Sequence, residues 1–193
     1  MLTFEKQFWS LGYSNVLGMD EAGRGPLAGP VCIAGVIFEE GQKIPEGIND
    51  SKKLSKATRE RLFDEIIQAA KAYEVVFVSA SRIDKVNILN AVKEGMRKIS
   101  KTLNADAILS DAVNFNYPNI HQIALIQGDS RSISIAAASI LAKVSRDRKM
   151  EELAKKYPQY GFEKHSAYGT KEHIQAIKKF GTCPEHRKTF KIK

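Results

Sequence analysis

The residues best suited to chemistry are four carboxylates, each at or beside the end of a short apolar run. Asp20 and Glu21 close the run VLGMDE, Asp111 closes AILSD and Asp129 closes ALIQGD. Carboxylate oxygens suit Mg²⁺ or Mn²⁺ rather than zinc. Clustered carboxylates repel one another unless cations neutralise them, and paired cations can activate water and stabilise the leaving oxygen of a phosphodiester. The pattern therefore predicts a divalent-metal site suited to phosphodiester hydrolysis.

These acids meet only if the strands that carry them are neighbours in one sheet. Apolar and β-branched runs predict strands at 16–20, 29–38, 73–80, 105–111 and 121–129. Amphipathic runs predict helices over the first dozen residues and at 56–73, 82–102, 133–157 and 171–180. Ser55, Ser81 and Thr170 are the expected N-caps of three of them, and Gly181 the expected C-cap of the last. Alternating strands and helices predict one α/β domain over residues 1–193, with ligands beyond the carboxyl ends of the strands.

Asp20 and Glu21 pose a geometric problem, because adjacent residues of a regular strand point to opposite faces. Both can serve one site only if the chain leaves strand geometry near Glu21, or if Glu21 reaches round the end of the strand. Gly23 and Gly25 follow directly, and glycine permits such a turn. Each acid alone is an ordinary strand-end residue, but the joint pattern favours metal ligands.

Charge and composition narrow the expected partners. Thirty Lys+Arg against twenty-two Asp+Glu give a net charge of +8, which favours nucleic acid as a partner. Cys32 and Cys183 are the only cysteines, and His165, His173 and His186 are too scattered to predict a ligand set. Since no signal peptide or apolar stretch of about 20 residues is visible, we expect a cytoplasmic protein without membrane contact. No extra interface element is visible, so we expect a monomer.

Six sequence blocks resemble those of the ribonuclease HII family, in the expected order. They are LGMDEAGRGPLAGPV, DSKKLS, ILSDAV, IQGDSRSISIAAASILAKVSRDR, YPQYGFEKHSAYGT and HRKTF. The resemblance implies a ribonuclease H-like fold, in which helices flank a central five-stranded mixed sheet over about 1–155. A C-terminal helical extension over about 156–193 would contact substrate. The implied enzyme uses two ions of Mg²⁺ or Mn²⁺. It cleaves RNA/DNA hybrids and nicks duplex DNA 5′ of an embedded ribonucleotide, leaving a 3′-hydroxyl and a 5′-phosphate.

The resemblance also implies roles for individual residues. The family's catalytic and metal-binding acids fall on Asp20, Glu21, Asp111 and Asp129. Its substrate-binding positions fall on Gly23, Arg24, Gly25 and Tyr168, and we expect further substrate contacts from Ser51, Lys52, Lys53, Lys143 and Arg146. A glycine loop lets backbone N–H groups approach the 2′-hydroxyl that distinguishes RNA from DNA. A tyrosine ring against the next sugar would resist an added hydroxyl, so loop and ring together would read an RNA-to-DNA step.

Two departures from the family pattern and two alternatives remain open. Ala167 replaces a glycine and Ser166 stands where a lysine is common, so a positive φ at 167 would strain the tyrosine loop. A ribonuclease HIII-like enzyme would need several consecutive ribonucleotides and an extra N-terminal domain, for which the block beginning at Leu17 leaves no room. A non-catalytic basic protein would bind duplexes in a salt-dependent way without cleaving them, and the four acids argue against it.

Overall fold

The computed structural model describes residues 1–192, which form a five-stranded mixed sheet in the order β3-β2-β1-β4-β5. The strands are β1 (Val16–Ala22), β2 (Val31–Ile37), β3 (Ala72–Val78), β4 (Ala107–Asp111) and β5 (His121–Leu125). β1, β2 and β3 pair antiparallel, whereas β1, β4 and β5 pair parallel. The central position of β1 makes β4 its direct neighbour, so their carboxyl ends share one edge of the sheet.

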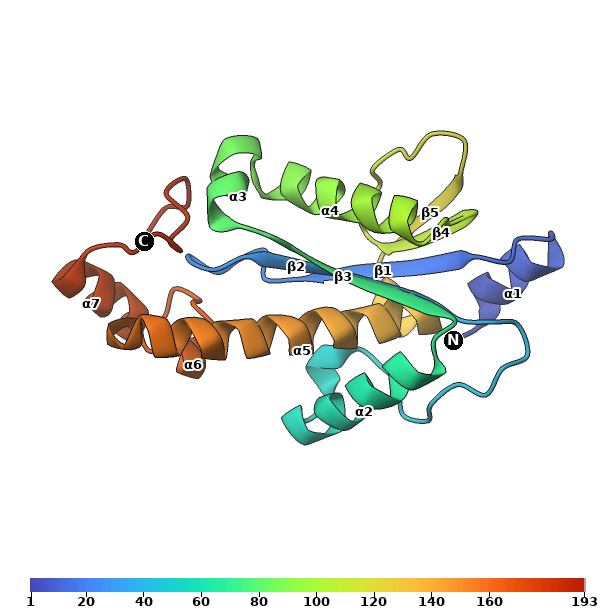
Figure 1. Ribbon diagram of the computed structural model, residues 1–193, viewed down its shortest axis with the longest axis horizontal. Coiled ribbons are helices and arrows are strands. Elements are labelled where there is room, and N and C mark those ends of the chain that lie inside the picture. The colour runs from blue at the N-terminus through green and yellow to red at the C-terminus, as the bar shows by residue number, and fades with distance from the viewer. Residues whose placement is uncertain (193) are drawn as a thin grey trace.

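Helices lie on both faces of the sheet and at its two ends. They are α1 (Thr3–Ser10), α2 (Lys56–Ala69), α3 (Ala80–Val86), α4 (Ile88–Thr102), α5 (Ile133–Lys156), α6 (Phe162–His165) and α7 (Lys171–Phe180). Figure 1 shows α3 and α4 on one face, with α2 and α5 on the other. The predicted α/β class and five-stranded mixed sheet are therefore confirmed.

Alternation along β2 builds the two halves of the core. Ile33 packs into the apolar cluster under α4, whereas Cys32 and Ala34 pack into the cluster under α5. On β1, a Cβ at Gly18 would lie 2.3 Å from the backbone carbon of Ser134, so a side chain there would push α5 away. The absence of a side chain at Gly18 thus allows α5 to pack closely against β1.

Several boundaries differ from the sequence-based expectation. The helix expected at 82–102 is wrong as one element, because Asn87 has φ 65° and divides it into α3 and α4, with Ser79 rather than Ser81 capping α3. α2 ends at Ala69, since β3 begins at Ala72. β1 continues through Ala22 instead of ending at Asp20. The N-caps expected at Ser55 and Thr170 are confirmed, as is Gly181 beyond α7.

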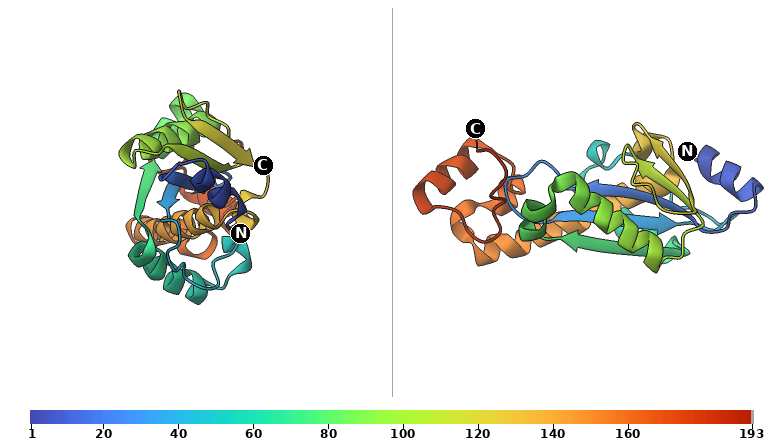
Figure 2. Two further views of the ribbon diagram at one scale, coloured as in Figure 1. Left: turned by 90° about the vertical axis from the view of Figure 1, so that its right-hand side faces the viewer. Right: turned by 90° about the horizontal axis from the view of Figure 1, so that it is seen from above.

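The C-terminal region extends beyond one end of the sheet. Figure 2, in its right view, shows α6 and α7 past the strands, with α1 at the opposite end. The last third of α5 carries Met150 and Leu153, which pack with Phe162 and Ile177 in a separate apolar cluster. Among residues 1–192, no helix is long and apolar enough to span a membrane.

Candidate active site

The edge formed by the ends of β1 and β4 brings three carboxylates together. Asp20, Asp111 and Asp129 each place one oxygen within 4.8 Å of the others. Asp129 does not end a strand as expected, because β5 stops at Leu125 and Gln127 turns the chain with φ 55°. Asp129 instead lies in the single 3₁₀ turn Gly128–Ser130, directly before α5.

Local hydrogen bonds fix the orientation of these carboxylates. The N–H of Gly128 donates to Asp111 Oδ1 at 2.7 Å, which ties the 3₁₀ turn to the end of β4. The N–H of Glu21 donates to Asp20 Oδ1 at 2.7 Å. The Lys52 ammonium lies 3.4 Å from Asp129 Oδ2. Each acid therefore keeps at least one oxygen that does not bond to the backbone.

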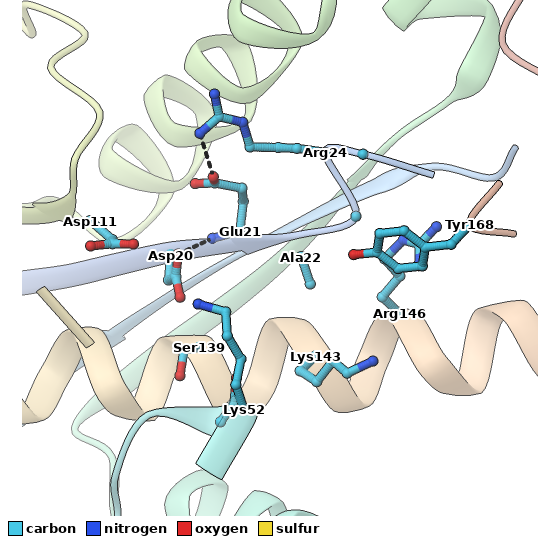
Figure 3. A pocket seen from close by; sticks show the side chains of 13 residues that line it. Asp20, Glu21, Ala22, Arg24, Lys52, Asp111, Ser139, Lys143, Arg146 and Tyr168 are labelled. Atoms are coloured by element: carbon cyan, nitrogen blue, oxygen red, sulfur yellow. Dashed lines mark hydrogen bonds and ion pairs between the residues drawn. The ribbon is translucent and has the colours of Figure 1, made fainter. Parts of the chain in front are cut away.

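Glu21 lies apart from this cluster, as regular strand geometry requires. β1 does not end before it, since Glu21 pairs with Ile33 of β2. Figure 3 shows Glu21 on the opposite side of β1 from Asp20, where Arg24 donates to its Oε1 at 3.2 Å. Its Oε2 is buried and accepts no hydrogen bond. Glu21 thus offers one free oxygen at the strand end.

Burial and nearby carboxylates disfavour ionisation of Asp20, Glu21 and Asp129. Burial raises the pKa of Asp20 well above its ordinary value, and the charges of Glu21 and Asp111 raise it further. Burial also raises the pKa of Glu21, although the Arg24 guanidinium lowers it. Burial and Asp50 raise the pKa of Asp129, against the opposing effect of Lys52. These side chains are stable in their ionised form when cations neutralise them. The group therefore suits divalent ions that are coordinated by oxygen.

The carboxylates form one end of a cleft whose other end is the glycine loop. The cleft holds a cavity of about 410 Å³. Of the predicted site residues, it is lined by Asp20, Glu21, Gly23, Arg24, Gly25, Ser51, Lys52, Asp111, Lys143, Arg146 and Tyr168. The remaining two, Asp129 and Lys53, line an adjoining cavity that shares Lys52 and Asp111 with the first. The fold thus gathers every predicted site residue along one continuous groove.

Comparison with known proteins decides the family. The model of the family described as Ribonuclease HII matches residues 17–193. The chain belongs to the ribonuclease HII family. It is 55% identical over 192 residues to the ribonuclease HII of Ruminiclostridium cellulolyticum, covering 98% of this chain and 75% of the relative. It is 50% identical over 193 residues to that of Halalkalibacterium halodurans, covering 99% and 73%.

Solved structures agree with this assignment. A ribonuclease HII from Archaeoglobus fulgidus, solved in complex with PCNA, has a TM-score of 0.80 and 28% identity, covering 93% of this chain and 96% of its own. A ribonuclease H2 from Pyrococcus horikoshii has a TM-score of 0.75 and 30% identity, covering 92% and 94%. A ribonuclease HIII with bound Mn²⁺ shares the fold, with a TM-score of 0.66 at 18% identity over 94% and 68% of the two chains.

Membership of the ribonuclease HII family makes this chain a divalent-metal-dependent endoribonuclease that hydrolyses RNA/DNA hybrids and binds nucleic acid. Basic residues lie on two sides of the cleft. Lys52 and Lys53 lie in the single 3₁₀ turn Ser51–Lys53, which Asp50 caps by accepting from the N–H of Lys52 at 2.9 Å. The Lys143 ammonium, across the cleft on α5, is paired with Asp147 at 2.7 Å.

The end of the cleft opposite the carboxylates consists of two loops in contact, the glycine loop and the loop that carries Tyr168. Tyr168 is 49% exposed, and a Cβ at Gly25 would lie 3.5 Å from Cε1 of its ring. The N–H of Leu27 donates to the carbonyl of Ala167 at 2.8 Å, joining the loops behind the ring. Ala167 has φ 63° and is fully buried, so the condition under which alanine strains this loop is met.

Arg146 is much more buried than the sequence led us to expect. We expected it to contact substrate, but its side chain is only 2% exposed. Its guanidinium donates to the carbonyls of Ala28, Pro30 and Ser166. Its N–H donors therefore bond to the protein's own backbone, although the side chain borders the cleft.

Sequence reasoning missed one residue that lines the cleft. Ser139 lines it from α5, and its spacing of four and seven residues from Lys143 and Arg146 is a helical signal that could have revealed it. Arg187, which belongs to the HRKTF block, donates to the carbonyls of Gly23 and Arg24 from the far end of the chain.

The histidines expected to be scattered are close together. His173 Nε2 lies 3.2 Å from His186 Nε2, and the ring of His165 stacks on that of His173 at 4.9 Å. The N–H of Cys183 donates to His186 Nδ1 at 3.0 Å. His186 therefore donates from Nε2 to His173, whose Nδ1–H donates to the carbonyl of Tyr168 at 3.0 Å. The cluster supports the tyrosine loop from behind.

Proposed function

We propose that this enzyme nicks duplex DNA on the 5′ side of an embedded ribonucleotide, leaving a 3′-hydroxyl and a 5′-phosphate. The observation that supports it is the shared cavity, which is lined by Asp20 and Asp111 at one end and by Gly25 and Tyr168 at the other. A strand lying along this groove would meet the recognition loops and the carboxylates at once. The phosphodiester that is hydrolysed would then lie next to the sugar that the loops recognise.

Asp20, Glu21, Asp111 and Asp129 are the proposed ligands of two divalent ions, Mg²⁺ or Mn²⁺. Bound ions would activate the attacking water and stabilise the charge of the leaving oxygen. The unpartnered Oε2 of Glu21 and the grouped oxygens of the three aspartates are the acceptors that favour this role. Arg24, which bonds to Glu21, would hold that carboxylate toward the cleft.

The remaining residues would bind and orient the substrate. The N–H groups of the Gly23–Gly25 loop would approach the ribose 2′-hydroxyl, since no Cβ of glycine blocks them. The half-exposed ring of Tyr168 would pack against the next deoxyribose. Ser51, Lys52 and Lys53 would bind backbone phosphates, with Lys143 on the other side of the groove.

All these residues come from one chain, so we propose that it works as a monomer and that 1–193 is one catalytic domain. The core over about 1–155 would supply the acids, and the segment over about 156–193 would supply Tyr168. Ala167 provides the specific reason for a second candidate function: its φ of 63° next to Tyr168 strains the loop. A displaced ring would leave a nuclease that cleaves only hybrids with several ribonucleotides.

The test is cleavage of three labelled substrates: a DNA duplex with one ribonucleotide, an all-DNA duplex, and a hybrid with several ribonucleotides. Each is incubated with Mg²⁺, Mn²⁺ or EDTA. The proposal predicts a metal-dependent nick 5′ to the lone ribonucleotide and no cut in all-DNA. Cleavage of the hybrid alone would support the second candidate. Binding without any cleavage would contradict both and leave a basic duplex-binding protein.

A further inference from the structure

Two buried arginines lie beneath the recognition loops without an acidic partner. Arg146 and Arg187 are each 2% exposed. Neither forms an ion pair with a carboxylate in the part of the chain that the structure describes. Burial lowers the pKa of both, and for Arg187 the charge of Arg146 adds to this effect. Buried cations are costly unless hydrogen bonds compensate them, so their acceptors indicate what the arginines are for.

Every acceptor of these guanidinium groups is a backbone carbonyl of a recognition segment. Arg187 donates to Gly23 at 2.7 Å, to Arg24 at 2.9 Å and to Gly29 at 3.0 Å. Arg146 donates to Pro30 at 3.1 Å, to Ala28 at 3.3 Å and twice to Ser166 at 3.2 and 3.3 Å. The acceptors belong to the loop 23–30 and to the residue two before Tyr168. None belongs to a strand that carries the carboxylates.

The contacts of Arg187 determine where the loop's N–H groups point. A trans peptide directs its C=O and N–H in opposite directions. The carbonyls of Gly23 and Arg24 share peptides with the N–H groups of Arg24 and Gly25. Because Arg187 holds both carbonyls from behind, the two N–H groups face away from it. Neither donates to any group in residues 1–192, and Gly25 lines the cleft.

The contacts of Arg146 tie this loop to the tyrosine loop. A Cβ at Gly23 would lie 1.9 Å from Arg146 Nε, so the glycine rests directly on the guanidinium. The same guanidinium holds the carbonyl of Ser166. Two backbone bonds reinforce the connection, from the N–H of Leu27 to Ala167 and from the N–H of Arg187 to Leu27, both 2.8 Å. Moving either loop would therefore disturb the other.

We propose that Arg146 and Arg187 are positioning residues that set the selectivity for a single ribonucleotide. They aim the N–H donors of the Gly23–Gly25 loop into the cleft and hold Tyr168 at a fixed distance from them. This inference rests on the proposed function, in which loop and ring read adjacent sugars. Neither arginine touches substrate.

The test compares Arg187→Lys and Arg146→Lys with the wild type. Lysine keeps the charge but cannot donate in a planar fork to several carbonyls. Arg97→Lys is the matched control, because Arg97 also donates to a backbone carbonyl, that of Phe115 at 2.8 Å, but lies on α4. For each protein, kcat and KM are measured on the single-ribonucleotide duplex and on the several-ribonucleotide hybrid, alongside the melting temperature.

A displacement of about 1 Å at such a site costs up to about 100-fold in rate. We expect kcat/KM on the single-ribonucleotide duplex to fall by about 10- to 100-fold in both variants, and the ratio of single-ribonucleotide to hybrid cleavage to fall by about tenfold. The double variant should lose little more than either single one, because the two act as a unit. Arg97→Lys should keep the wild-type ratio. Variants that lose stability but keep the ratio would overturn the inference.

If the variants do not fold, a measurement on the wild type tests the inference instead. Amide hydrogen exchange of Leu27 and Arg187 should be as slow as that of the core strand β2, since their bonds would lock the loops together. Exchange as fast as in exposed loops would overturn the inference. A wild type that cleaves only the hybrid would instead refute the proposed function itself. A selective wild type with equally selective variants would refute only the role of the arginines.

Discussion

The two ends of the cleft are built in different ways. At the carboxylate end, Asp20 and Asp111 come from paired strands, and the register of β1 and β4 decides their separation. At the recognition end, the loop 23–30 and Tyr168 are held by hydrogen bonds from buried side chains to carbonyls. The first end is a group of mutually repelling carboxylates, whereas the second presents backbone N–H groups, Arg24 and the Tyr168 ring, with two buried arginines behind them.

This difference implies a division of labour. Strand ends supply rigid positions for groups that must converge to within a few ångströms. Loops supply free N–H groups, and they need a separate support to stay rigid. Changes at the carboxylate end should therefore abolish hydrolysis and leave the fold intact. Changes at the recognition end should alter stability and selectivity together.

The largest expected effect is at the carboxylate end. Asp111→Asn keeps an oxygen to accept from the N–H of Gly128 but removes a charged ligand. Changing even the partners of metal ligands costs about 10- to 100-fold, so we expect a loss of more than about 100-fold in cleavage, with the melting temperature of the metal-free protein unchanged or higher. Asp106→Asn, just before the other end of β4, is the control and should cleave normally. Substantial cleavage by Asp111→Asn would refute the assigned chemistry.

Gly23→Ala should lower the stability of the protein by disturbing the recognition end. Gly23 has φ +96°, and its new Cβ would meet Arg146, so strain and overpacking should cost about 2–4 kcal/mol of unfolding free energy. Gly25→Ala places its Cβ at an ordinary 3.5 Å from Tyr168, and we expect a change below about 1 kcal/mol. Chemical denaturation measures both. Equal losses would show that the loop does not rest on Arg146.

Acid should weaken the support of the tyrosine loop. Burial lowers the pKa of His186 to about 4 and also lowers that of His173. An unfolded histidine binds its proton near pH 6.5, so the unfolded state binds more protons between about pH 6.5 and 4. Stability is therefore complete above that window and is lost as the pH falls through it. We expect the melting temperature to drop by about 5 °C between pH 7 and pH 5.

His186→Gln should flatten this pH profile, at the cost of a lower melting temperature at pH 7. His121→Gln, at an exposed histidine outside the cluster, is the matched control. The same slope in the wild type and in His186→Gln would exclude the histidine cluster as the origin of the acid sensitivity.

The smallest effect is expected at Ala167. Ala167→Gly relieves about 1 kcal/mol of strain at φ 63° but loses a buried methyl worth about 0.8 kcal/mol and about 0.5 kcal/mol of chain entropy. The net change in melting temperature should stay below about 3 °C. Ala28 is equally buried but does not have a positive φ. Ala28→Gly therefore loses the methyl group and the chain entropy without relieving strain, and the variant should be clearly less stable than the wild type. Equal losses at the two positions would mean that Ala167 carries no strain.

The carboxylate end could be predicted from sequence because its signals are local. Apolar β runs ending at Asp20 and Asp111 indicate strands, and strand ends converge in an open sheet. Asn87 escaped prediction because the amphipathic pattern continues through it. Asp129 was displaced from its expected strand by Gln127, a residue that adopts a positive φ without being glycine.

The recognition end depends on contacts between residues far apart in the chain. The gap of 13 residues between His173 and His186 closes to 3.2 Å only because the chain returns after α7. The charge on Arg146 suggested substrate binding, since sequence does not distinguish a buried arginine from an exposed one. The contact of Arg187 with Gly23 spans 164 residues. Such support becomes visible only in the folded chain.

The most direct test of this division of labour is a competition between the two substrates in one tube. A single-ribonucleotide duplex and a several-ribonucleotide hybrid, with different labels, are cleaved by the wild type, Tyr168→Ala and Tyr168→Phe. We predict that Tyr168→Ala loses about tenfold in relative preference for the single ribonucleotide while still cleaving the hybrid, because burying an apolar side-chain face is worth about 1.5–3 kcal/mol and tenfold corresponds to about 1.4 kcal/mol. Tyr168→Phe should keep the preference. An unchanged preference in Tyr168→Ala, or equal loss on both substrates, would contradict the account.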